Sequence, residues 1–337
     1  MHFIEIFSEN LLSPAILFFA LGVIAGYIKS DLDVPDSISR YLAIYLMMAI
    51  GFKGGAAIAA SPSINLIMAA TILAGICMSF AQPFLSYALL RATTNLDRPT
   101  AAAVGGHYGS VSIVTFVTAV SFLATQGITH QGWMPAVVAL MEAPAILSAL
   151  YIAHRSAPET IEVGKQATPK LAREIFTNGA ILLLTGSFIV GALTGESGLK
   201  KVEGFLVTPF QGILALFLLD MGLFVSRQAH HLKELNWRVA LFGLYMPLTG
   251  ASVGLGLSWL IGLDVGTGAL FMALCASASY IAVPAAMRLA LPQAKAGVYL
   301  PLSLSITFPF NILFGIPLYV ALAEAVLQPL SGGITLP

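Results

Sequence analysis

Two clusters of small and hydroxylated residues interrupt otherwise apolar stretches of this chain. The first is GGHYGSVS at 105–112, and the second is ASASY at 276–280, with Pro284 four residues later. Proline and glycine favour a break in a helix. Inside hydrocarbon, a broken backbone is tolerated only where protein or a wet cavity satisfies its polar groups. Paired interruptions of this kind are typical of the solute site of a secondary transporter.

Each interruption offers groups that suit a small anion and a sodium ion. A helix that restarts after a break presents free N–H groups, which favour an anion, while the carbonyls before the break favour sodium. Hydroxyl groups can donate or accept hydrogen bonds. The predicted anion-binding residues are Gly106, His107, Tyr108, Gly109, Ser110, Ala278, Ser279 and Tyr280. The alternative is that these small residues only allow helices to pack closely.

Glu142 lies in the middle of the apolar segment MPAVVALMEAPAILSAL, two residues before Pro144. An ionisable side chain at that depth is costly and indicates a functional site. Glu142 is expected to coordinate sodium or to carry a proton, and the alternative is a purely structural partner. Thr307 and Asn311, around Pro309, offer neutral oxygens in the second half. The predicted sodium ligands are Ser110, Ser112, Glu142, Ser277, Thr307 and Asn311.

Composition indicates a membrane protein. Of the 337 residues, 58% are hydrophobic and 9% are charged, whereas soluble domains are roughly a quarter charged. A net charge of zero gives no basic surface for nucleic acid. The chain shows no zinc helix, nucleophile elbow or phosphate loop, so we expect no enzyme activity and no cofactor, with sodium only as a coupling ion.

The apolar runs predict an all-α polytopic fold with ten transmembrane helices. The predicted spans are 12–28, 37–59, 64–91, 99–124, 132–154, 177–195, 203–226, 237–262, 265–291 and 297–327. The last span is longer than a bilayer needs and is expected to tilt or to end in an interfacial turn. The chain therefore divides into a first five-span repeat at 1–154, a connector at 155–176 and a second five-span repeat at 177–337.

The distribution of Lys and Arg predicts the orientation. Lys53, Lys200 and Lys201 fall on the side that holds the termini, and the other thirteen of the sixteen basic residues fall on the opposite side. The positive-inside rule then places both termini outside and the 155–175 connector in the cytoplasm of a plasma membrane, the inner membrane of a bacterium.

Internal similarity suggests that the two halves are related. Small-residue motifs recur 165 to 171 positions apart, with Ser110 over Ser279 and Glu142 over Thr307. Because each half has five spans, the second half would enter the bilayer from the opposite side. We therefore expect two inverted repeats, each with one broken helix.

The segments GGHYGSVSIVTFVTAV, MEAPAILSALYIA and CASASYIAVPAAMRLALP resemble the sodium-dependent bicarbonate permease family, and the similarity extends over most of the chain. The resemblance implies sodium-coupled bicarbonate uptake, a homotrimer and control by a PII-like nucleotide-binding protein. It assigns the sites to the meeting point of the broken helices, with Ser110, Ser279 and Glu142 as matching residues. Bicarbonate-transporting members carry an aspartate where this chain has Tyr280, so a divergent branch is one interpretation.

The leading hypothesis is a symporter of sodium and a small anion, most simply bicarbonate, that works by alternating access. Spans 1–2 and 6–7 would form a scaffold that also makes the oligomer contacts. Spans 3–5 and 8–10 would form a moving core. The first alternative is a proton-coupled transporter or sodium/proton exchanger that uses Glu142. The second is a membrane sensor that binds its ligand without transporting it.

Overall fold

The structure is a computed structural model that describes residues 2–60, 66–156, 179–232, 235–280, 283–284, 287, 291 and 293–327. These residues form helices joined by turns and short irregular segments, and no strand occurs among them. The fold is therefore all-helical, as the composition predicts. Most of the expected 155–176 connector lies outside the described residues, as do parts of the stretch around Pro284.

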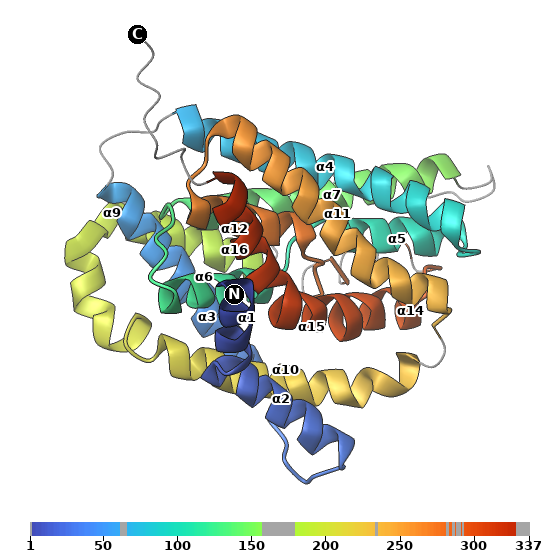
Figure 1. The fold of residues 1–337 in the computed structure, drawn as a ribbon, viewed down its shortest axis with the longest axis horizontal. Helices are drawn as coiled ribbons and strands as arrows, with labels where there is room; N and C mark the ends of the chain where they lie inside the picture. Colours follow the sequence, from blue (N-terminus) through green and yellow to red (C-terminus); the bar gives the residue numbers. More distant parts are fainter. Residues whose placement is uncertain are drawn as a thin grey trace.

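Figure 1 shows the arrangement of the helices. Their bounds are α1 His2–Leu11, α2 Pro14–Tyr27, α3 Asp36–Ala59, α4 Leu66–Thr93, α5 Arg98–Gly109, α6 Ile113–Thr125, α7 Met134–Ser156, α9 Gly179–Leu206, α10 Phe210–Leu232, α11 Trp237–Ile261, α12 Val265–Ala276, α14 Ala296–Pro301, α15 Phe308–Phe310 and α16 Ile316–Leu327. Two π-helical segments, η1 Leu302–Thr307 and η2 Asn311–Gly315, join the last three into one long element.

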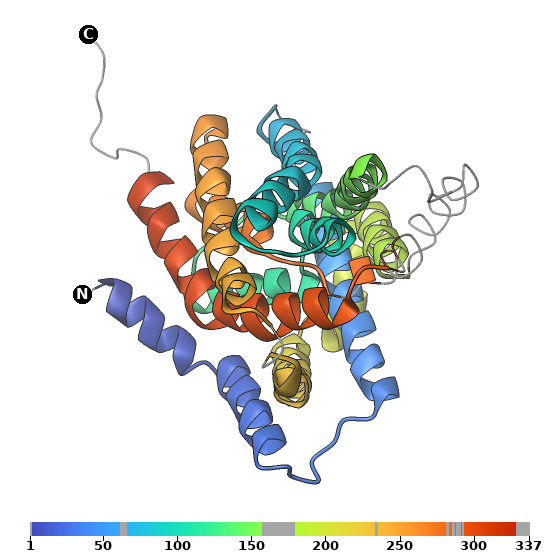
Figure 2. The same ribbon diagram turned by 90° about the vertical axis from the view of Figure 1, so that its right-hand side faces the viewer.

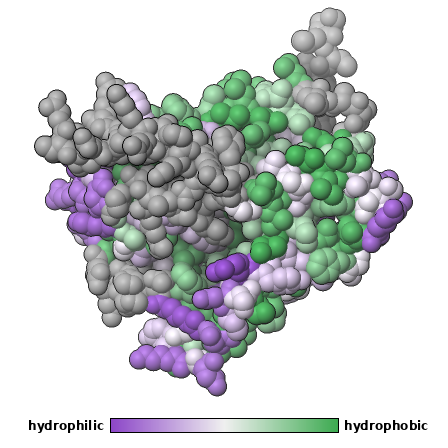
Figure 3. Space-filling model, turned by 180° about the vertical axis from the view of Figure 1, so that it is seen from behind, coloured by the Kyte–Doolittle hydropathy of each residue, from purple (hydrophilic) through white to green (hydrophobic). Residues whose placement is uncertain are grey.

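Eight helical segments among the described residues are long and apolar enough to cross a membrane. They coincide with eight of the ten predicted spans. The first and ninth spans correspond to the shorter helices α2, of 14 residues, and α12, of 12 residues. In Figure 3, hydrophobic residues cover much of the coloured surface in the right half of the view, and hydrophilic residues lie at the left, lower and right margins and in one group near the middle. The long apolar helices are typical of a multi-pass membrane protein.

Helix α1 precedes the first predicted span and was not anticipated from the sequence. It lies beside the C-terminal helices, as Figure 2 shows. The buried Asn10 amide donates to the carbonyl oxygens of Ile312 (2.9 Å) and Leu313 (3.2 Å) in η2. A π-helical turn shifts the backbone hydrogen bonds from their usual partners. The Asn10 side chain therefore satisfies acceptors that this distortion leaves available.

Two other segments differ from the sequence-based boundaries. The sixth span was predicted to end at 195, but α9 continues to Leu206 after a bend at Gly195, whose φ of 58° favours glycine. The last span was expected to tilt or to end in an interfacial turn. The structure gives a helical segment of 32 residues, Ala296–Leu327, that contains the π-helical segments η1 and η2, and its tilt in a membrane stays a prediction.

Helices α2 and α10 pack closely, and so do α3 and α9, because glycines remove the side chains between them. A Cβ atom at Gly22 or Gly222 would lie 2.1 or 2.2 Å from a carbonyl oxygen of the partner helix. A Cβ atom at Gly55 or Gly191 would lie 1.9 or 2.1 Å from one. These distances are shorter than any normal van der Waals contact. The two helix pairs therefore need glycine at all four positions.

Replacing Gly191 by alanine is expected to destabilise the protein, because the new methyl group must push α9 away from α3. Overpacking in a tight interior typically costs about 1–3 kcal/mol. Gly186 on the same helix is the matched control, since a Cβ atom there meets nothing within 4 Å. Thermal unfolding in detergent should show a clear loss for Gly191→Ala and little change for Gly186→Ala. Equal melting temperatures would contradict the close packing.

Helices α5 and α12 begin in the same way. The Asp97 carboxylate accepts a hydrogen bond from the Thr100 backbone N–H at 2.8 Å, and Asp264 accepts one from Thr267 at 2.9 Å. Aspartate is a favoured N-cap residue because it satisfies a free N–H group and stabilises the positive end of the helix. Each helix is then 12 residues long. The two broken spans thus share the same starting point and the same length.

The surroundings of the two caps show that α5 and α12 run towards each other. The Thr100 hydroxyl accepts from the Lys295 backbone N–H at 3.1 Å, so α5 begins beside the segment that follows the second break. The Thr267 hydroxyl accepts from the Gln131 backbone N–H at 2.9 Å, so α12 begins beside the loop that follows the first broken span. Figure 1 accordingly shows α5 and α12 on opposite sides of the centre.

Candidate functional site

Both broken helices end at a serine. Ser110 follows α5 with φ −85° and ψ 173°, and Ser277 follows α12 with φ −84° and ψ 163°. These extended conformations stop the helix and expose its last carbonyl groups. In the first half the chain restarts at α6, where the Ser112 hydroxyl accepts from the Thr115 N–H at 3.2 Å. Helix α12 ends eight residues before Pro284, so the break does not depend on that proline.

The two extended segments cross and bond to each other. The Ser279 N–H donates to the His107 carbonyl at 2.8 Å, and His107 Nδ1 donates to the Ser279 carbonyl at 2.6 Å. The Ser112 N–H donates to the Ser277 hydroxyl at 2.9 Å. These contacts join residues more than 160 positions apart. The structure therefore brings the two predicted clusters together in one buried site.

The His107 ring is held in one orientation. Its Nδ1 atom must carry a proton, because the Ser279 carbonyl oxygen can only accept. The ring also stacks on Tyr299 at a centroid distance of 4.7 Å. In the neutral ring, Nε2 then presents a lone pair, and this atom has no hydrogen-bond partner among the described residues although His107 is 0% exposed. A buried acceptor without a donor favours a ligand that supplies one.

Glu142 on α7 lies beside the first break. Its Oε2 atom accepts a hydrogen bond from the Ser110 hydroxyl at 2.6 Å, and the residue is only 2% exposed. No Lys or Arg nitrogen within 4 Å of this carboxylate is recorded in the described part of the chain. A buried carboxylate without such a partner is costly unless a cation or a proton neutralises it. Glu142 and Ser110 thus form a buried polar pair whose negative charge a cation or a proton can neutralise, and their coordination of sodium stays a prediction.

The other predicted sodium ligands have structural partners. The Thr307 hydroxyl donates to the Gly243 carbonyl at 2.8 Å and also contacts the Tyr108 hydroxyl. The Asn311 amide donates to the Ala276 carbonyl at 2.9 Å, the last residue of α12. Both side chains thus fix the surroundings of the breaks. Whether they, Ser112 or Ser277 also coordinate sodium stays a prediction.

The glycines of the first cluster face neighbouring helices. A Cβ atom at Gly109 would lie 2.4 Å from the Pro83 ring of α4, and one at Gly106 would lie 2.9 Å from Ala149 of α7. Ala278 is buried in the apolar cluster around Tyr108. These positions bring α4 and α7 close to the break. A direct contact of these small residues with the anion stays a prediction.

Tyr280 lies at the end of a cavity. The cavity has a volume of about 350 Å³ and is lined by Asp36, Ser39, Arg40, Ala43, Phe217, Met221, Phe224, Tyr280, Leu300 and Leu304. The Tyr280 ring packs edge-on against Phe308, with the centroids 5.4 Å apart. Its buried hydroxyl lies near Ser112 without a hydrogen bond of normal geometry. Tyr280 therefore lines this cavity and also places its hydroxyl near Ser112 at the first break.

Sequence reasoning missed several residues that build the site. Gln82 on α4 donates from its amide to the Cys275 carbonyl at 2.9 Å, which holds α12 just before its end. Tyr319 donates to the Asn311 side-chain oxygen at 2.7 Å. A buried glutamine in the middle of an apolar span, directly before Pro83, was the available signal for the first. Asp36 and Arg40 line the Tyr280 cavity, and the sequence does not reveal that cavity.

Comparison with known proteins agrees with the geometry. A family model described as the Na⁺-dependent bicarbonate transporter superfamily matches residues 14–324. The match includes both broken helices and Glu142, so the resemblance drawn from those segments is confirmed at the level of the family. A search of curated proteins finds no match.

Proposed function

Because the chain belongs to the Na⁺-dependent bicarbonate transporter superfamily, we propose that it carries sodium and bicarbonate together across a plasma membrane by alternating access. The observation that supports this most is the crossing of two broken helices, which concentrates polar groups inside an apolar protein. On the positive-inside rule, both termini face outside and the connector faces the cytoplasm.

The two halves are proposed to form an inverted repeat. The helix caps Asp97 and Asp264 are 167 positions apart, and so are the helix-ending residues Ser110 and Ser277. The contacts around Thr100 are repeated around Thr267. The glycine contacts between α2 and α10 are likewise repeated between α9 and α3. These matches support a pseudo-twofold relation, in a register two residues away from the sequence pairing of Ser110 with Ser279.

Alternating access requires a barrier that can open to either side. Helices α3 and α10, which belong to the proposed scaffold, meet core elements along one seam. The Tyr280 cavity occupies one end of this seam, and a second cavity beside Lys53 occupies the other. Between them the seam is apolar and leaves only about 10 Å³ of space among Ala43, Leu46, Met47, Ile113, Val114, Val117 and Phe217. Such a seam can slide without breaking ion pairs.

The polarity of His107 supports bicarbonate over small anions that lack a hydrogen-bond donor. Bicarbonate carries one O–H group that can donate to the unpaired Nε2 atom, and its remaining oxygens can accept from N–H groups. Nitrate and chloride have no donor and would leave Nε2 unsatisfied. A site that hydrogen-bonds a substrate O–H rejects analogues that lack it.

Sodium is proposed to bind beside Glu142 and Ser110, where it would neutralise the buried carboxylate. An anion bound at the adjacent crossing would then be attracted by the same cation. Each ligand should therefore raise the affinity for the other.

Uptake of labelled bicarbonate into proteoliposomes tests the function. With an inward tenfold sodium gradient, we expect accumulation up to about tenfold above equilibrium, because a tenfold gradient stores about 1.4 kcal/mol. Collapse of the gradient with a sodium ionophore should abolish accumulation. Equal uptake with and without sodium, or no uptake by folded protein, would contradict the proposal.

A proton-coupled mechanism is the second candidate, and the buried Glu142 carboxylate is the observation that favours it. A proton could neutralise this group in place of sodium. Accumulation driven by a pH gradient in the absence of sodium would support this candidate against the first.

The proposed assembly is a homotrimer that a PII-like protein regulates, on the basis of the family resemblance alone. The mass of the purified protein in a native-like bilayer, measured with and without a PII-like protein, would test both points.

A further inference from the structure

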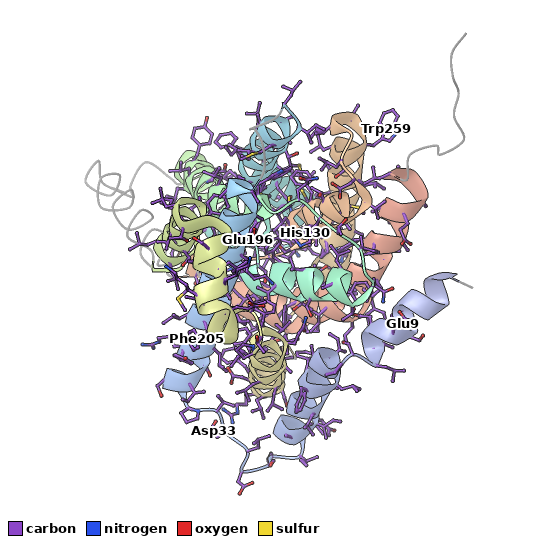
Figure 4. All side chains as sticks on the ribbon, turned by 90° about the vertical axis from the view of Figure 1, so that its left-hand side faces the viewer. Glu9, Asp33, His130, Glu196, Phe205 and Trp259 are labelled. Atoms are coloured by element: carbon purple, nitrogen blue, oxygen red, sulfur yellow. The ribbon has the colours of Figure 1, made fainter. Side chains whose placement is uncertain are left out.

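A second cavity lies at the end of the scaffold seam opposite to Tyr280. Its volume is about 230 Å³, and it is lined by Ile50, Lys53, Gly54, Ala57, Phe116, Val120, His130, Gly132, Pro135 and Phe210. Figure 4 looks onto this end of the molecule and shows His130 near its centre. Helix α3 borders both cavities, with Arg40 at one and Lys53 at the other. Thirteen helical residues separate these two cations by about 20 Å.

Lys53 is a half-buried cation inside a membrane-spanning helix. Its ammonium nitrogen lies 5.2 Å from the centroid of the Phe210 ring, so the side chain extends from α3 towards α10. Among the residues that the structure describes, no carboxylate within 4 Å of this nitrogen is recorded. An unpaired charge at a membrane-embedded cavity is expensive and indicates a function.

Asp264 is the acidic residue recorded as acting on His130 in this cavity, and its carboxylate is held by hydrogen bonds to other residues. Asp264 caps α12 through Thr267, accepting from its N–H at 2.9 Å and its hydroxyl at 2.8 Å. It also accepts from the Gln131 amide at 3.3 Å. These three hydrogen bonds fix the Asp264 carboxylate at the start of α12. Its negative charge still acts on His130, but no ion pair of Asp264 with Lys53 within 4 Å is recorded among the described residues.

His130 adds no positive charge to the cavity at neutral pH. Burial and the nearby Lys53 ammonium hold the pKa of the imidazole below its usual value of 6.5, although the Gln131 carbonyl and Asp264 oppose this shift. The Nδ1 atom donates to the Gln131 carbonyl at 3.2 Å. Lys53 therefore supplies the positive potential among the residues that line this cavity, and the Asp264 carboxylate at the start of α12 opposes it. Apolar walls focus that potential and raise the local concentration of anions.

We propose that this Lys53 cavity is a recruitment site for small monovalent anions on the side of the membrane opposite to the Tyr280 cavity. The inference rests on the proposed function, in which the core must exchange its anion with each side in turn. Lys53 would hold the anion near the seam until the core opens towards it. The site is separate from the crossing of the broken helices, and it needs no movement to bind an anion.

The local potential can be measured without transport. Ala57 lies one turn beyond Lys53 and lines the same cavity. In an Ala57→Cys protein that lacks the natural thiols (Cys77→Ser and Cys275→Ala), the new thiol is labelled with a negatively charged and a positively charged methanethiosulfonate. We define the ratio as the labelling rate of the negative reagent divided by that of the positive reagent. Adding Lys53→Gln should lower this ratio about tenfold, because the focused positive charge is lost. The effect should shrink in high salt.

Lys201→Gln is the matched control, because Lys201 is an exposed lysine on α9 outside the cavity. An unchanged rate ratio in Lys53→Gln, or an equal fall in Lys201→Gln, would overturn the recruitment site. In proteoliposomes, Lys53→Gln should raise the KM for bicarbonate and leave kcat nearly unchanged. A lowered rate ratio with an unaltered KM would show that the cavity is not on the anion path and would also overturn the proposal. If the labelling-rate ratio depends on Lys53 but the protein transports no bicarbonate, the proposed function is refuted, whereas the attraction of anions into the Lys53 cavity is supported.

Discussion

Glu142→Gln is expected to lower sodium-driven bicarbonate uptake by about 10- to 100-fold, the range seen when the surroundings of a bound metal ion are altered. Glutamine keeps the size of the side chain and can still accept from the Ser110 hydroxyl. It removes the negative charge that would compensate sodium in the proposed buried site. The sodium concentration that gives half-maximal uptake should therefore rise steeply, while the folded structure is retained.

Glu203→Gln, which makes the same change at an exposed position of α9, is the control and should transport normally. Wild-type sodium activation in Glu142→Gln would contradict the assignment of sodium to this carboxylate. If Glu142→Gln keeps its sodium dependence but loses its response to a pH gradient, Glu142 carries a proton and does not bind sodium.

His107→Phe is expected to reduce uptake by about 10- to 100-fold and to remove the preference for bicarbonate over nitrate. Phenylalanine leaves the Ser279 carbonyl without its donor and the substrate O–H without its acceptor. Each unpaired buried group costs about 1–3 kcal/mol, and about 1.4 kcal/mol corresponds to a factor of ten. Inhibition of labelled bicarbonate uptake by unlabelled nitrate and bicarbonate measures the preference.

His107→Gln is the conservative variant, since its amide can both donate and accept. We expect it to recover part of the uptake and part of the selectivity. If His107→Phe lowers uptake but leaves the ratio of nitrate to bicarbonate inhibition unchanged, the histidine only holds the two breaks together. Strong inhibition of the wild-type protein by nitrate would refute the role of Nε2 as an acceptor for the substrate.

The sequence predicted the membrane class and the position of both breaks, because each depends on local composition, and it predicted the family through the resemblance of particular segments. Clusters of glycine and serine stand out against apolar residues, and α5 and α12 end at Ser110 and Ser277 within those clusters. The sequence-based alignment of the two halves paired Ser110 with Ser279 because the residues around them are of similar types. The capping motifs DRPT at 97–100 and DVGT at 264–267 instead pair Ser110 with Ser277, and the equal lengths of α5 and α12 support this pairing.

The remaining features depend on contacts between distant residues. The hydrogen bond from Asn10 to Ile312 joins positions about 300 apart, and the bond from Gln82 to Cys275 joins positions 193 apart. No periodicity or motif in either segment identifies its partner. The sequence likewise does not predict the Lys53 cavity, because it shows only a lysine near the end of an apolar span.

The length of the two broken helices has an electrical consequence. Twelve residues extend about 18 Å, and the hydrocarbon layer is about 30 Å thick, so in the proposed inverted repeat α5 and α12 would meet near the middle of the membrane from opposite sides. A single charge that enters to this depth crosses about half of the membrane voltage, and the whole voltage is worth about 2.3 kcal/mol per 100 mV. Sodium and bicarbonate that enter together have no net charge, so the voltage does no work on the pair. Under the proposed one-to-one symport, the fold would allow a cell to use its sodium gradient for this anion without drawing on its membrane potential.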